Sequence, residues 1–144
     1  RTCAENVNLC EWRCKHPSGR EWVTQDRHPE LIDALFERIG TVTREFVEFG
    51  FDTNLQCGHG GGGSNTCALH LSGWHGLLLD GGHENSQINL HRAWISSDTI
   101  VRTLEAHNVS RKLDFLSVDI DSVDFWVLQA ILSAGFQPRV VSVE

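Results

Sequence analysis

Short apolar segments that alternate with helical patterns constrain the fold of this chain most strongly. Apolar residues recur at helical spacing in the ranges 29–39, 64–71, 99–107 and 122–134. Strand-like segments lie between them, at 44–50, 74–80, 113–119 and 139–144, with a weaker one at 93–95. Buried strands that alternate with helices are typical of a parallel sheet covered on both faces. We therefore predict an α/β fold with a Rossmann-like, doubly wound, mostly parallel sheet.

The chain divides into two regions of different character. Residues 1–43 combine a polar, cysteine-containing extension with the first predicted helix, and residues 44–144 carry all the predicted strands. A domain of this type normally continues past its fifth strand with a closing helix. We therefore expect residues 44–144 to be a partial Rossmann domain, truncated after the fifth strand.

Charge and hydropathy narrow the classes of partner. The 144 residues carry a net charge of −7 and no run of Lys or Arg. Because phosphate backbones require clustered positive charge, we expect no nucleic-acid partner. No apolar stretch approaches the roughly 18 residues that span a bilayer, so the sequence predicts no transmembrane segment.

Five cysteines leave at least one that is free or paired outside the chain. Cys57 and Cys67 flank a glycine-rich loop at 58–63 and can close it with a disulfide. Three more lie in the N-terminal extension, where a disulfide, plain thiols and, with His16, a zinc site all stay open: Cys3, Cys10 and Cys14. The same extension is a candidate binding region for a protein partner. This pattern leaves the compartment unknown, with a lean towards a secretory or organellar lumen.

Acidic residues and a glycine follow the predicted strands at one edge of the sheet. Glu48 and Gly50 end the first strand, Asp80 ends the second, and Asp119 and Asp121 end the fourth. In doubly wound sheets, ligands bind outside the carboxyl ends of the strands. A glycine lets backbone approach a ligand closely, and a carboxylate accepts hydrogen bonds from ribose hydroxyls or faces a cation. The layout suits a nucleoside with a positively charged tail, although each acid also fits ordinary turn or helix capping.

Other conspicuous residues have simpler interpretations. The glycine-rich loop lacks the Lys-Ser/Thr of a P-loop and is read as a tolerated insertion. Of the histidines, His83 lies beside Asp80 in a loop that faces the predicted site, and His70 and His75 are read as surface or capping groups. The tryptophans at 74, 94 and 126 are expected in the core rather than on a stacking platform.

The motifs of the second region, taken together, resemble a known family. They are Phe46-Val47-Glu48-Phe49-Gly50 and the segments at 64–66, 73–80, 114–121 and 138–144. This set, spread over residues 44–144, resembles the FkbM-like methyltransferases with their algal and bacterial relatives. The resemblance implies a class I methyltransferase fold, S-adenosylmethionine as the methyl donor and O-methylation of a hydroxyl group. It implies cofactor contacts at Glu48, Gly50, Asp80 and Asp119, and a small-molecule or glycan-type acceptor.

The end of the fourth strand resembles a second motif. It is similar to the Asp-Ala-Asp turn of metal-dependent O-methyltransferases, which implies that Asp119 can ligate a divalent cation. Asp121 and His83 are the candidate catalytic bases. Phe51 and Asp52 stand where the usual turn has further glycines, and this departure also fits a non-catalytic Rossmann scaffold, a structural or assembly subunit. Both functions stay open at this point.

Overall fold

The computed structural model describes residues 28–54, 57 and 64–144, and the predicted roles of the N-terminal cysteines and of the loop at 58–63 lie outside these residues. Helices and strands alternate along the described chain. In order, the elements are α1 (His28–Ile39), β1 (Glu45–Phe49), α2 (Cys67–Leu71), β2 (His75–Asp80), the 3-10 helix η2 (Ser86–Ile88), β3 (Leu90–Arg92), α3 (Ile100–Ala106), β4 (Phe115–Val118), α4 (Asp124–Ser133) and β5 (Val140–Val143).

The five strands form one parallel sheet in the order β3-β2-β1-β4-β5. The chain moves from β1 outward to β3, crosses back through α3, and continues outward from β4, so the strand order reverses between β1 and β4. This confirms the predicted α/β fold with a parallel, Rossmann-like sheet. In doubly wound sheets the point of reversal leaves a crevice at the carboxyl ends of the two central strands.

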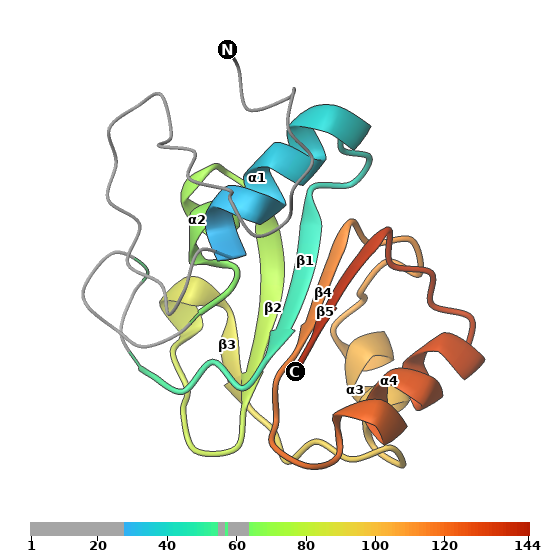
Figure 1. The fold of residues 1–144 in the computed structure, drawn as a ribbon. Coiled ribbons are helices and arrows are strands. Elements are labelled where there is room, and N and C mark those ends of the chain that lie inside the picture. Colours follow the sequence, from blue (N-terminus) through green and yellow to red (C-terminus); the bar gives the residue numbers. More distant parts are fainter. Residues whose placement is uncertain (1–27, 55–56, 58–63) are drawn as a thin grey trace.

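Helices cover both faces of the sheet, and each face has its own core (Figure 1). α1 and α2 pack against Phe46, Leu78 and Phe115, while α3 and α4 pack against alternate residues such as Val47 and Leu116. Successive side chains of a strand point to opposite faces, which explains this division. Because α1 belongs to the first of these cores, the first predicted helix is continuous with the sheet domain.

The third strand differs from its predicted position. β3 begins at Leu90, which is fully buried and pairs with Leu78, whereas the expected segment at 93–95 forms no strand. Trp94, in the middle of that segment, is 86% exposed. The prediction followed the most apolar tripeptide, but burial against β2 selects the residues that pair.

Two cross-links fix the elements around β1. Cys57 and Cys67 form a disulfide, which confirms that these two cysteines can close the loop between them. At the amino end of the sheet, the buried Asp114 accepts hydrogen bonds from the backbone N–H groups of residues 42, 43 and 44 at 2.8–2.9 Å and pairs with Arg139 at 2.7 Å. Within the described part of the chain, no helix is long and apolar enough to cross a membrane.

Candidate functional site

A cavity of about 690 Å³ opens at the carboxyl ends of the central strands. This volume is in the range of small-molecule sites. Its lining comes from four segments that are far apart in the sequence: Gly50 and Asp52 after β1, Asp80 and Gly81 after β2, residues 93–97 after β3, and residues 119–123 with Trp126 after β4. The structure therefore brings together Gly50, Asp80, Asp119 and Asp121, four of the predicted site residues.

Gly50 sets the distance between the two central strands at this edge. Its φ is +79°, and a Cβ at this position would overlap the backbone carbonyl oxygen of Asp119. Only glycine therefore fits here without moving β4. Asp52, Asp121 and Ser122 on the same rim also have positive φ, at 52°, 52° and 87°. Non-glycine residues seldom adopt this conformation, and such residues cluster at binding sites, where the surrounding structure holds them in place.

Asp80 is a buried carboxylate with an unusually dense set of donors. Its Oδ1 accepts the backbone N–H groups of Gly82 and His83 at 2.7 and 2.9 Å and faces Nδ1 of His83 at 2.8 Å, while its Oδ2 accepts the N–H of Asp52 at 3.0 Å. Burial alone would raise the pKa of Asp80, but these hydrogen bonds together lower it below its ordinary value. Asp80 is therefore ionised and fixed in orientation, and Oδ2 keeps a lone pair for a ligand.

His83 supports Asp80 and does not itself line the cavity. Its ring stands beside Asp80, with about a third of the side chain exposed. The structure thus places this candidate base behind the carboxylate, and Asp121 is the candidate base that reaches the cavity wall.

The prediction that Glu48 lies at the same rim is wrong. Glu48 is 2% exposed, and its carboxylate accepts hydrogen bonds from the Ser64 hydroxyl at 2.8 Å, the Asn65 N–H at 2.6 Å and the Thr66 hydroxyl. The strand alternation explains this, because Glu48 shares its face with Phe46 and points towards α2. Burial raises the pKa of Glu48, and the hydrogen bonds from residues 64, 65 and 66 counter only part of that effect. Glu48 anchors the start of α2 to β1.

Acidic groups gather at the end of β4, and their arrangement bears on the predicted cation at Asp119. Glu144 forms a hydrogen bond with Asp119, and this bond raises the pKa of Glu144. The negative charges of Asp119 and Asp121, followed by burial and the charge of Asp124, raise it further. The carboxylate of Asp124 is already engaged, because it accepts the N–H of Ile120 at 2.9 Å. Among the residues that the structure describes, no group of three or more His, Cys, Asp or Glu is arranged to hold a metal ion. The geometry therefore supplies no ligand set to accompany Asp119.

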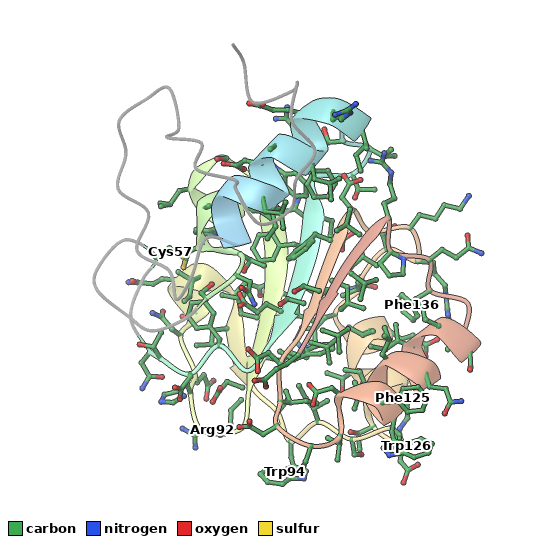
Figure 2. All side chains as sticks on the ribbon, in the orientation of Figure 1. Cys57, Arg92, Trp94, Phe125, Trp126 and Phe136 are labelled. Atoms are coloured by element: carbon green, nitrogen blue, oxygen red, sulfur yellow. A yellow bond between two sulfur atoms is a disulfide. The ribbon has the colours of Figure 1, made fainter. Side chains whose placement is uncertain are left out.

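Two of the three tryptophans expected in the core are on the surface. Trp74 is buried and packs edge-on against Phe36 with ring centroids 4.8 Å apart, but Trp94 is 86% and Trp126 is 58% exposed. Both line the cavity. Figure 2 shows Trp94, Phe125 and Trp126 at the end of the molecule where the strands finish. The prediction failed because an apolar residue in a helical or strand-like pattern was assumed to face inward.

Among the lining residues that were not predicted from the sequence, three change the character of the site most. They are Asp52, Trp94 and Trp126. A signal for Asp52 existed, because a residue two positions after the strand-ending glycine lies at the same rim. With Asp52 the cavity wall holds four aspartates, and none of the lining residues in the described part of the chain is Lys, Arg or His. Arg92, which ends β3, is exposed but is not part of the wall.

Comparison with known proteins gives no match. No protein-family model, no curated protein and no solved structure matches the chain. The function is therefore argued from the geometry and charge of the cavity.

Proposed function

We propose that this chain binds S-adenosylmethionine in the cavity and transfers its methyl group to a hydroxyl group of an acceptor. The observation that carries the proposal is a small-molecule cavity at the β1–β4 reversal; among the residues that the structure describes, its wall has four carboxylates and no basic residue. Methyl donors of this type carry a sulfonium and an ammonium group, which such a wall attracts. Dinucleotides and nucleoside phosphates carry the opposite charge, and the same wall repels them.

The residues present fit the adenosine part of this ligand. Asp80 is held rigidly and keeps a free lone pair on Oδ2 for a ribose hydroxyl. Gly50 provides the cradle, since any Cβ there would fill the space between the two strands. The ring of Trp94 lies over Gly81, the residue after Asp80, where a Cβ would come within 3.6 Å of it. An adenine attached to a ribose at Asp80 would therefore find an aromatic surface beside it.

The carboxylates at the end of β4 suit the reacting end of the ligand. Asp119 and Asp121 face the cavity from the strand next to Gly50 and favour positive charge there. When bound, S-adenosylmethionine supplies an electrophilic methyl group whose carbon–sulfur bond breaks with the electron pair remaining on sulfur. Asp121 accepts the proton that the acceptor hydroxyl loses as its oxygen bonds to the methyl carbon, and it returns that proton to water. Most of the rate would come from holding the acceptor oxygen in line with that bond.

Calorimetric titration of the chain with S-adenosylmethionine tests the proposal, with NAD as an anionic comparison ligand. We expect S-adenosylmethionine to bind and NAD to bind far more weakly. Asp80→Ala removes an ionised hydrogen-bond acceptor and should weaken binding by about 10- to 150-fold. The matched control is Asp98→Asn, which removes one exposed negative charge just outside the cavity wall and should leave binding nearly unchanged.

A second candidate function has an observation of its own. Three large apolar residues on the outer side of α4 are 47–63% exposed, which is typical of an interaction surface: Phe125, Trp126 and Leu132. A folded chain that binds no S-adenosylmethionine at millimolar concentration would contradict the methyltransferase proposal and favour a non-catalytic interaction module on the same scaffold.

A further inference from the structure

We propose that Trp126 forms a stacking surface for a carbohydrate ring at the mouth of the cavity, so that the acceptor is a glycan. The assignment of this ring as the methyl acceptor rests on the proposed function, whereas its binding does not. Trp126 lines the cavity from the first turn of α4 and is 58% exposed. Large aromatic side chains that remain open to solvent beside a cavity are typical of ligand-binding surfaces.

The indole of Trp126 packs against a neighbouring ring, which restricts its orientation. Phe125 packs against it edge to face, with ring centroids 5.0 Å apart and an angle of 79° between the ring planes. The helix turn below is fixed as well, because the buried carboxylate of Asp124 accepts the N–H of Ile120. A surface whose rings are already ordered loses little entropy when a flat ligand stacks on it.

The polar groups beside the indole match a sugar. Asp121 and Ser122 line the same side of the cavity as Trp126, and Asp119 lies deeper on the same strand end. A pyranose has a face of C–H groups that can pack on an indole, and hydroxyl groups on its rim that can donate to carboxylates. An anionic lipid surface would meet four carboxylates in this wall, which makes a membrane an unfavourable occupant.

Trp126 lies away from Asp80, the residue at which the nucleoside is proposed to bind. Trp94 follows β3 and lies over Gly81 beside Asp80, whereas Trp126 follows β4 on the other side of the strand reversal. In Figure 2 the two side chains lie at different positions along the same end of the molecule. The two tryptophans therefore line the cavity from different segments, and we place the second molecule at Trp126 and adenosine at Asp80.

Saturation-transfer NMR with a panel of neutral trisaccharides tests the inference. The probes are maltotriose, cellotriose, xylotriose, mannotriose and chitotriose, each with the full chain, with and without S-adenosylhomocysteine. At least one trisaccharide should show saturation of the C–H protons on one ring face. Trp126→Ala should weaken this binding about tenfold, and Trp126→Phe, which keeps an aromatic face, should lose less. Leu132→Ala is the matched control, because it removes an exposed apolar side chain of α4 that does not line the cavity.

The outcomes separate this inference from the proposed function. If the chain binds S-adenosylmethionine and no trisaccharide of the panel shows binding that depends on Trp126, the carbohydrate assignment is overturned while the methyltransferase proposal stands. Trisaccharide binding that depends on Trp126 without any S-adenosylmethionine binding supports the carbohydrate site and refutes the methyltransferase. A tri-lysine peptide that binds through Trp126 in place of the trisaccharides would overturn the assignment in favour of a cationic peptide partner.

Discussion

Replacing Gly50 with alanine tests whether the close approach of β1 and β4 shapes the cavity. Two costs arise at this position. A non-glycine residue at φ +79° costs about 1–2 kcal/mol, and the overlap of the new Cβ with the Asp119 carbonyl oxygen adds about 1–3 kcal/mol. The overlapping atom belongs to the backbone directly after the central strand β4, so no side chain can turn away to relieve it. We therefore expect Gly50→Ala to lower the free energy of unfolding by about 2–5 kcal/mol.

The chain offers a matched control for the first of these costs. Gly73 has a φ of +82°, nearly that of Gly50, but a Cβ there would meet nothing within 4 Å. Gly73→Ala should therefore show the backbone cost alone, about 1–2 kcal/mol. The difference between the two variants, measured by urea unfolding with tryptophan fluorescence and circular dichroism, isolates the contact between Gly50 and Asp119. Equal unfolding midpoints for the two variants would refute the argument that the close approach of Asp119 leaves no room for a side chain at Gly50.

The same variant also reports on the site. Relief of the overlap requires the backbone of Asp119 to move, and Asp119 lines the cavity. Calorimetry under conditions where Gly50→Ala is still folded should show weaker S-adenosylmethionine binding than for Gly73→Ala. Unchanged affinity would mean that ligand binding does not depend on this edge of the sheet.

Three further predictions concern the rest of the structure. Asp114→Asn should lower stability by about 2–4 kcal/mol in urea unfolding at neutral pH. Burial raises the pKa of Asp114, but the pair with Arg139 and three backbone N–H donors lower it below its ordinary value. The stabilisation from Asp114 is therefore present above the ordinary carboxyl pKa and is lost as the pH falls through the pKa of the folded state. A variant whose stability falls with acid as steeply as that of the wild type would contradict this. The double variant Cys57→Ser with Cys67→Ser should lose about 3 kcal/mol of stability relative to the wild type under oxidising conditions, and a reductant should abolish that difference between the two proteins. Trp94→Ala should leave the unfolding midpoint unchanged, because the side chain is 86% exposed, and should remove part of the fluorescence change on titration with S-adenosylmethionine; an unaltered fluorescence change would place the adenine elsewhere.

The sequence predicted the fold well because burial leaves a strong pattern along a strand. The segments at 74–80 and 113–119 are apolar on both faces, and both contain central strands of the observed sheet. The weak third strand was misplaced by three residues because apolar composition does not say which residues pair. A neighbour in space, Leu78 on β2, decides that β3 begins at Leu90.

The site was predicted less well, and the errors have a common physical origin. Asp80 and Asp119 stand at or just beyond the ends of their strands, where a side chain is free to turn towards the edge, and both line the cavity. Glu48 is still within its strand, where alternation fixes its direction. Trp126 lies on a helix whose apolar residues occur on more than one side, so periodicity could not tell its inner from its outer face.

Glu48 nevertheless contributes to the site through the strands that it joins. It lies opposite Ser117 in the register of β1 and β4, and the segment at 64–66 bridges both residues. Asn65 donates its N–H to Glu48 and its side-chain amide to Ser117 at 3.0 Å, so one residue clamps the two central strands from the α2 face. Two residues further along each strand, Gly50 and Asp119 approach each other at the cavity edge. A change that breaks these two hydrogen bonds of Asn65 should increase the distance between β1 and β4, as a Cβ at Gly50 would. Either change should therefore weaken the binding of a ligand that depends on the spacing of the two strands.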